Sequence, residues 1–135
     1  MAELDQTAAM TAIDAPVTLE ELDEAQIRVD LAAAFRLAAR FDLHESVANH
    51  FSAAVSPDGK RFLCNPKWRH FSLVRASELV LLDADDPSTM DRPDAPDPSA
   101  WCIHGAVHQR ISTARAVLHC HPPYASALIG LEDPT

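Results

Sequence analysis

Hydrophobic residues recur at helical spacing in the first third of the chain. Between positions 27 and 38 they lie three or four residues apart, which places them on one face of a helix. Residues 18–21, Thr-Leu-Glu-Glu, have the form of a capping box, in which two side chains bond to backbone amides at a helix start. The pattern therefore predicts a helix that ends near Phe41 and buries one apolar stripe. The stripe consists of Ile27, Leu31, Ala34, Phe35 and Ala38.

Three shorter apolar segments have the composition of β-strands. Two of them, residues 47–55 and 61–65, flank a Ser-Pro-Asp-Gly turn at 56–59, and this arrangement predicts a hairpin. Residues 78–83 form the third strand candidate, with an almost continuous apolar core. Residues 83–98 then break the pattern with six aspartates and four prolines, a composition that indicates an exposed loop.

A second long helix is predicted after this loop. Asp97 suits the N-cap and Pro98 the first helical position. His104 and His108 lie four residues apart, on one helical face. This pair is an alternative candidate for a zinc site, but we expect it to have a core or interface role. The apolar side of the helix is expected to consist of Trp101, Ile103, Val107 and Ile111.

The order of elements predicts the fold class. A further strand before Pro122 and a short helix over residues 122–129 complete the series. We expect an α/β fold of the layered α+β kind, with three α/β/α layers around a mostly antiparallel central sheet. A chain of 135 residues has the usual length of one domain. Residues 1–16 are small, polar and acidic and are expected to form a flexible tail, which leaves residues 17–135 as the domain.

Composition narrows the classes of partner. The net charge of −9 argues against nucleic acid and against an anionic membrane surface, because both reward clustered Lys and Arg. No apolar stretch approaches the roughly 20 residues that span a bilayer. The first residues lack the basic start and apolar core of a signal peptide, so we expect a cytoplasmic protein. Three widely spaced cysteines without a CxxC motif are expected to be reduced thiols: Cys64, Cys102 and Cys120.

The most informative motif is His119-Cys120-His121, which ends an apolar strand candidate at residues 114–121. Side chains two apart on a strand point to the same face, so both imidazoles project together while Cys120 turns away. Two imidazoles on a rigid strand begin a zinc site, but zinc usually takes at least three protein ligands. Spacing alone leaves a second interpretation open, in which both histidines are buried and satisfied by hydrogen bonds.

Five segments together resemble the class II aldolase/adducin family, and they occur in the order of that family. The resemblance covers about residues 20–135. It implies the layered fold described above, with a further C-terminal region that this chain lacks, so the domain is expected to be partial. The five segments are Ala-Asn-His-Phe-Ser at 48–52, Arg-Phe-Leu-Cys-Asn-Pro at 61–66, Ala-Ser-Glu-Leu-Val-Leu-Leu-Asp at 76–83, Pro-Ser-Ala-Trp-Cys-Ile-His at 98–104 and Ala-Val-Leu-His-Cys-His-Pro at 116–122.

The resemblance also implies site residues. His119 and His121 inherit the role of ligands to zinc or another divalent metal, while the third family histidine lies beyond the end of this chain. The position of the family's catalytic carboxylate is occupied by Ala100, which cannot move a proton, so no catalytic residue is assigned. Family members have a glycine in the loop after Asn-Pro, where this chain has Lys-Trp-Arg-His. Residues expected to bind substrate are Asn49, Ser52, Lys67 and Ser99.

Two functional classes remain open at this point. The first is a metal-dependent carbon–carbon lyase that acts on a small oxygenated substrate, with weak or lost activity; His50, His70 and His104 are its candidates for a replacement base or third ligand. The second is a non-catalytic adducin-like structural or interaction domain. The resemblance implies a homo-oligomer, since the family enzymes are ring-like tetramers. An actin or cytoskeletal partner has no support beyond the resemblance.

Overall fold

The computed structural model of the chain describes residues 23–132, and the elements follow the predicted order. Three short 3₁₀ turns, at Phe71–Leu73, Ala76–Glu78 and Pro87–Met90, lie between the strands and helices. The helices and strands are α1 (Glu24–Arg40), β1 (His50–Ala54), β2 (Arg61–Cys64), β3 (Val80–Asp83), α2 (Pro98–Arg110), β4 (Ala116–His119) and α3 (Pro123–Ile129).

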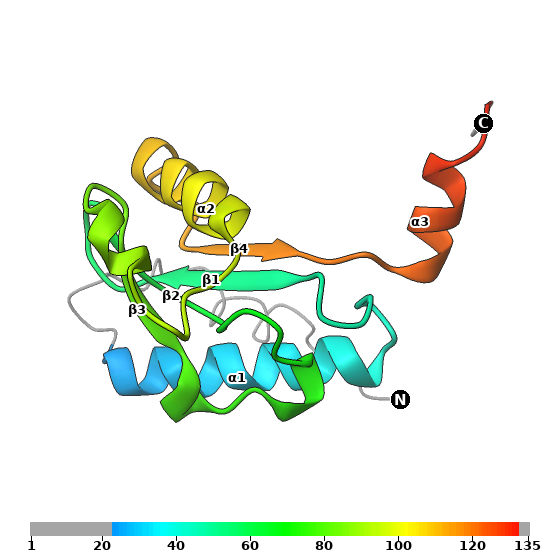
Figure 1. Cartoon of the computed structure of the whole chain (residues 1–135), viewed down its shortest axis with the longest axis horizontal. Coiled ribbons are helices and arrows are strands. Elements are labelled where there is room, and N and C mark those ends of the chain that lie inside the picture. Colours follow the sequence, from blue (N-terminus) through cyan, green and yellow to red (C-terminus); the bar gives the residue numbers. More distant parts are fainter. Residues whose placement is uncertain (1–22, 133–135) are drawn as a thin grey trace, which may run out of the picture.

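The four described strands form one sheet in the order β3-β2-β1-β4, and every pair is antiparallel. Helix α1 covers one face of this sheet and α2 covers the other, while α3 extends away from the layers (Figure 1). The predicted three-layer architecture with an antiparallel sheet is therefore confirmed for the described part of the chain.

Helix α1 begins and ends with identifiable caps. Oδ1 of Asp23 accepts a hydrogen bond from the amide of Ala25 at 3.0 Å, which satisfies one free donor at the helix start. The capping box predicted at residues 18–21 and the tail at 1–16 lie outside the described residues. The helix ends at Arg40, close to the predicted end at Phe41.

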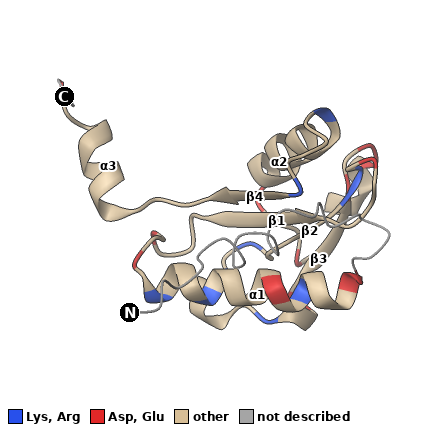
Figure 2. Ribbon diagram, turned by 180° about the vertical axis from the view of Figure 1, so that it is seen from behind, with Lys and Arg blue, Asp and Glu red and all other residues tan. Residues whose placement is uncertain are grey.

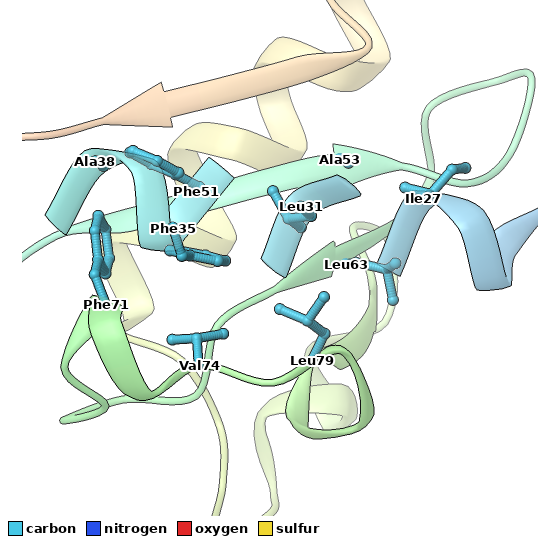
Figure 3. Packing of buried hydrophobic residues seen from close by; sticks show 10 residues of the cluster. All are labelled: Ile27, Leu31, Phe35, Ala38, Phe51, Ala53, Leu63, Phe71, Val74 and Leu79. Atoms are coloured by element: carbon cyan, nitrogen blue, oxygen red, sulfur yellow. The ribbon is translucent and has the colours of Figure 1, made fainter. Parts of the chain in front are cut away.

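The apolar stripe of α1 packs against the sheet and the 3₁₀ turns (Figure 3). Phe35 is fully buried; its ring stacks on Phe51 of β1 with centroids 5.0 Å apart and meets Phe71 edge-on at 4.6 Å. Ala32 joins the buried face, whereas Ala34 is only half-buried. The predicted stripe thus forms the core between α1 and the sheet.

The apolar side predicted for α2 is wrong. Ile103 and Ile111 are 57% and 50% exposed. The face that meets the sheet carries small residues and histidines instead: Ala100, His104, Gly105 and His108. Small residues allow the helix to approach closely, because a Cβ on Gly105 would already lie 3.1 Å from the Cβ of Ala84. The core role expected for His104 and His108 is confirmed, since both are 1% exposed.

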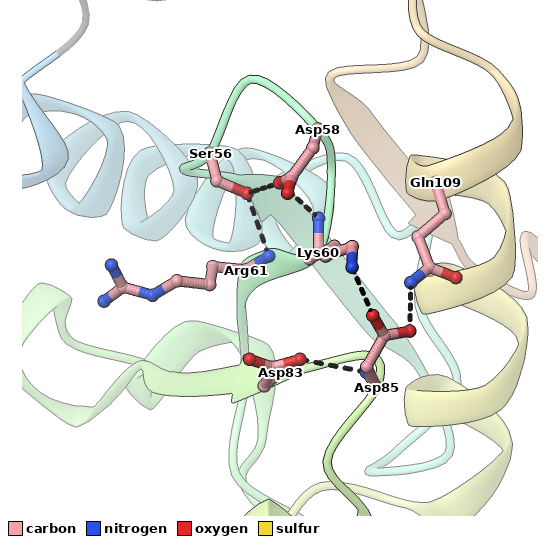
Figure 4. A network of polar contacts seen from close by, with 7 residues as sticks. All are labelled: Ser56, Asp58, Lys60, Arg61, Asp83, Asp85 and Gln109. Atoms are coloured by element: carbon pink, nitrogen blue, oxygen red, sulfur yellow. Dashed lines mark hydrogen bonds and ion pairs between the residues drawn. The ribbon is translucent and has the colours of Figure 1, made fainter.

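The predicted hairpin turn is tied to α2. Gly59 has a φ of +72°, and a Cβ at this position would lie 2.1 Å from the carbonyl oxygen of His108, so the turn needs glycine for both reasons. Beside it, the Asp85 carboxylate accepts from Lys60 at 2.6 Å and from the Gln109 amide at 2.7 Å (Figure 4). These contacts connect the hairpin, the loop after β3 and the helix at one end of the sheet.

The loop predicted over residues 83–98 is largely exposed, as expected, but it is not without structure. Residues 87–90 form a 3₁₀ turn capped by Asp86, and Pro96 is fully buried. Along α1, the two acidic residues lie in the first half of the helix, whereas two of the three basic residues, Arg36 and Arg40, lie in the second half (Figure 2). Within the described range, no helix is both long and apolar enough to cross a bilayer.

Candidate functional site

The two histidines at the end of β4 face each other, as predicted. Nε2 of His119 and Nε2 of His121 lie 2.8 Å apart, with the rings nearly perpendicular. Cys120, between them, is half-buried against the core on the α1 side of the sheet. The strand itself ends at His119, two residues before His121, so the observed strand is shorter than the predicted one over residues 114–121.

Two residues near the start of β1 hold His121 in place. A carboxylate oxygen of Glu45 accepts a hydrogen bond from Nδ1 of His121 at 2.8 Å. Oδ1 of Asn49 accepts from the backbone amide of His121 at 2.8 Å, and Nδ2 of Asn49 donates to the carbonyl of Glu45 at 2.8 Å. A neutral His121 with its proton on Nδ1 leaves Nε2 free to bind a metal. Sequence reasoning missed Glu45, because a loop glutamate 76 residues away carries no pattern that indicates this contact.

His50 lies beside the pair. It is the register partner of His119 across β1 and β4, and the two rings stack with centroids 4.5 Å apart and planes 18° apart. Burial, and then the neighbouring His119, lower the pKa of His50; burial also lowers the pKa of His119. Both rings are therefore neutral near pH 7, as a metal ligand or hydrogen-bond acceptor must be.

A cavity of about 280 Å³ opens next to these histidines. At its rim, Nζ of Lys67 lies 3.9 Å from the Asp97 carboxylate and 4.7 Å above the Trp68 ring. Hydrogen bonds from the side chain and backbone of Ser99 lower the pKa of Asp97. The lining residues are Val47, Ala48, Asn49, His50, Asn65, Lys67, Trp68, Asp97, Ser99 and His119.

Trp68 occupies a backbone position that suits glycine. Its φ of +64° is in the left-handed region, where a Cβ is disfavoured. The loop conformation after Asn65-Pro66 is thus one that glycine adopts without strain, while this chain places a side chain there that is 69% exposed at the cavity.

The structure brings most of the sequence-predicted site residues together. Asn49, Lys67 and Ser99 line the cavity with His119. Ser52 does not line it: this residue is fully buried, and its hydroxyl contacts His104 and His108. Ser52 shares the α2-facing side of β1 with His50, but it lies two residues further along the strand, where α2 covers it.

Ala100 and His70 also lie away from the cavity lining. Ala100 is fully buried and packs with Phe62 between α2 and the sheet. Nε2 of His70 lies 2.9 Å from Nε2 of His44, in a separate part of the surface beside the end of α1. Of the three histidines considered as a replacement base or third ligand, only His50 lines the cavity.

The donor set fits two ligands of a zinc site. Imidazole nitrogens suit zinc, and the Glu45–His121 contact is the kind of carboxylate–histidine pair that orients a metal ligand. The described residues, however, contain no group of three or more His, Cys, Asp or Glu side chains that could hold a metal ion.

Comparison with known proteins gives a consistent family match. The model of the class II aldolase and adducin N-terminal domain matches residues 29–134. A protein of Pseudomonas aeruginosa named as an aldolase class 2 protein is 41% identical over 98 residues, which are 73% of this chain and 38% of that protein. An adducin-related protein of Schizosaccharomyces pombe is 31% identical over 112 residues, 78% of this chain and 35% of that protein.

Solved structures share the fold. An aldolase II superfamily protein from Pseudomonas syringae superposes with a TM-score of 0.69 at 33% identity, covering 85% of this chain and 47% of that chain. L-fuculose 1-phosphate aldolase from Glaciozyma antarctica has a TM-score of 0.72 at 25% identity, covering 87% and 48%. This chain therefore spans less than half the length of these relatives.

Proposed function

Because the chain belongs to the class II aldolase and adducin N-terminal domain family, we propose that it provides the metal-binding part of a class II aldolase-type site for a small oxygenated substrate. The observation that carries the proposal is the pair of imidazole nitrogens 2.8 Å apart, one of them oriented by Glu45. His119 and His121 would hold zinc or another divalent cation. A bound divalent metal supplies Lewis-acid polarisation of a carbonyl or hydroxyl oxygen.

The residues around the pair have separate tasks. Asn49 fixes the backbone of His121 to the loop before β1. Lys67 places a cation at the cavity, where it can attract an anionic group of a substrate such as a phosphate. Ala100 has no group that can transfer a proton and lies outside the cavity lining, so this part of the site binds and orients but lacks the expected carboxylate.

The missing carboxylate favours a second candidate function. A domain that keeps the fold without the proton-transfer group would act as a non-catalytic adducin-like module. The 31% identity to an adducin-related protein supports this alternative. In that case the histidine pair would have a structural role, and the fold would be equally stable with and without metal.

Zinc titration by calorimetry separates the two candidates. The first predicts about one equivalent of zinc, bound weakly because two imidazoles leave the remaining coordination positions to water. His121→Ala should reduce the affinity by at least about tenfold. His70→Asn is the matched control, because His70 does not line the cavity and asparagine can still cap the turn at Ser72. Zinc binding that is absent, or unchanged in His121→Ala, would favour the adducin-like module.

A further inference from the structure

A continuous series of polar contacts crosses the layer between β1 and α2. Nδ1 of His50 lies 2.9 Å from Nε2 of His104, and Nδ1 of His104 lies 2.6 Å from Oγ of Ser52. Oγ of Ser52 also lies 2.8 Å from Nε2 of His108, whose Nδ1 lies 2.9 Å from the carbonyl oxygen of Ala114. His50 lines the cavity and the other side chains are buried, so the series runs from the core to the candidate site.

The spacing of the two elements produces this alignment. His50 and Ser52 are two residues apart on a strand, a distance of roughly 6.6 Å. His104 and His108 are four residues apart on a helix, a rise of roughly 6 Å. Each pair occupies one face of its element, and the two faces are in contact. The distance between the members of one pair is nearly the same as in the other pair.

The direction of every hydrogen bond in the series follows from its buried end. The carbonyl of Ala114 can only accept, so Nδ1 of His108 carries a proton and donates. A neutral His108 then accepts at Nε2, which requires the hydroxyl of Ser52 to donate to it.

The same reasoning continues to the cavity. The Ser52 hydroxyl has a single proton, so its oxygen must accept from Nδ1 of His104. A neutral His104 then accepts at Nε2, and Nδ1 of His50 must be the donor. The proton positions of three imidazoles are thus determined by one backbone carbonyl.

The steps through His104 and His108 require that both rings be neutral. Each is 1% exposed, and the partners that their ring nitrogens contact are imidazole, hydroxyl and carbonyl groups. Burial lowers the pKa of His104 to about 3 and also lowers the pKa of His108. The direction of the series does not depend on the titration of His50, because Nδ1 of that residue donates in either protonation state.

The cavity end of the series leaves one acceptor without a partner. Nε2 of His50 lies 3.5 Å from Oγ of Ser99, but that hydroxyl is 2.6 Å from the Asp97 carboxylate, the stronger acceptor. With its proton directed to Asp97, Ser99 does not satisfy His50. His50 is 8% exposed and lines the cavity, so a hydrogen-bond partner for Nε2 can come from the cavity.

We infer that the series from Ala114 to His50 fixes Nδ1 of His50 as the hydrogen-bond donor to His104, so that Nε2 is the ring nitrogen directed to the cavity, where the neutral ring accepts a hydrogen bond from a ligand hydroxyl. His104, Ser52 and His108 are positioning residues in this arrangement. The identity of the ligand as a small hydroxylated compound rests on the proposed function; the tautomer does not.

Nitrogen-detected NMR on protein labelled with ¹⁵N-histidine tests the tautomer directly, because protonated and unprotonated ring nitrogens have well-separated chemical shifts. The expected result near neutral pH is a proton on Nδ1 of His50, His104 and His108, with unprotonated Nε2 at His104 and His108. A proton on Nε2 of His104 or His108, or a His50 ring protonated on Nε2 but not on Nδ1, would overturn the inference. This measurement needs only the unmodified chain, so it does not depend on a variant that folds.

Two serine variants test the connection. Ser52→Ala removes the central link, and His50 should change from one tautomer to a mixture. Ser99→Ala is the matched control, since Ser99 also borders His50 but donates to Asp97; its loss should leave the His50 tautomer unchanged. A His50 tautomer that is unaffected in a folded Ser52→Ala protein would contradict the inference.

Two probe molecules test the acceptor role. Dihydroxyacetone should shift the Nε2 resonance of His50, whereas acetone, which has the carbonyl but no hydroxyl, should not. Equal shifts with both, or none with either, would overturn this role. Zinc calorimetry on the same samples keeps the two proposals apart: absent zinc binding would contradict the metal site, whereas a wrong tautomer would contradict only the present inference.

Discussion

The Glu45 carboxylate and Nδ1 of His121 are 2.8 Å apart, although 76 residues separate them in the sequence. The contact joins the loop after α1 to the end of β4. Because a carboxylate accepts and does not donate, it places the proton of His121 on Nδ1 and leaves Nε2 toward His119.

Removal of this carboxylate should weaken metal binding without removing a ligand. We expect Glu45→Ala to lower zinc affinity by about 10–100-fold, the usual effect of losing a group that orients a metal-bound histidine. Glu45→Gln is the matched variant, because its amide oxygen can still accept from Nδ1 and should preserve more of the affinity. Calorimetry measures both, and equal affinity of Glu45→Ala and the unmodified protein would contradict the role given to this residue.

Two glycines should respond differently to the same substitution. Gly59→Ala should destabilise the fold by about 2 kcal/mol or more, because the added Cβ meets the His108 carbonyl and the backbone has positive φ. Gly130→Ala should be neutral or slightly stabilising, by up to about 1 kcal/mol, since the nearest atom to its Cβ is an ordinary 3.7 Å away. Urea denaturation measures the two free energies of unfolding. Similar values for both variants would show that the turn does not contact α2 as described.

Stability should fall as the pH is lowered below the unfolded pKa of histidine, about 6.5. Burial lowers the pKa of His104 to about 3 and lowers that of His108, so between these values the unfolded chain binds protons that the folded chain does not. Each such group changes the free energy of unfolding by about 1.4 kcal/mol per pH unit once the unfolded form is protonated.

Urea midpoints between about pH 7 and pH 5 test this dependence, because carboxylates such as Asp97 protonate only at lower pH. His104→Gln should reduce the pH slope by about one proton, since it removes one of the two most buried histidines. A midpoint that does not change over this interval would contradict the neutral state assigned to these histidines.

Aldolase activity toward phosphorylated ketoses should be negligible. The position expected to hold the proton-transferring carboxylate is Ala100, and such groups typically contribute about 10²–10⁴-fold to the rate. A coupled assay with purified protein measures this directly, and cleavage at ordinary enzyme rates would show that another base is present.

Introducing the carboxylate should not restore activity. Ala100 is fully buried beside Phe62, so Ala100→Glu should destabilise the fold by about 3 kcal/mol or more through overpacking and an unpaired charge. Ala33→Glu, on the exposed side of α1, is the control and should change stability by no more than about 0.5 kcal/mol. Thermal unfolding measures both. An Ala100→Glu protein as stable as this control would mean that position 100 is accessible to the cavity.

The hydrophobic pattern determined the elements that depend on local spacing. The stripe that contains Phe35 predicts α1, the turn at 56–59 predicts the hairpin, and alternation along the strand candidate at 114–121 predicts that His119 and His121 face the same way. These predictions succeed because helix and strand periods are properties of the backbone itself. Asp97 and Pro98 likewise mark the start of α2, since a cap acts within one helical turn.

Only the tertiary structure decided which side of α2 is buried and which residues surround the histidine pair. Ile103 is apolar yet exposed, whereas His104 is polar yet buried, because the partners of His104 are supplied by β1 more than fifty residues earlier. The Glu45–His121 contact and the position of Ser52 outside the cavity lining were likewise decided by the tertiary structure. A polar side chain is buried where a distant group satisfies its hydrogen bonds, and that group's position is set by how the layers pack rather than by local spacing.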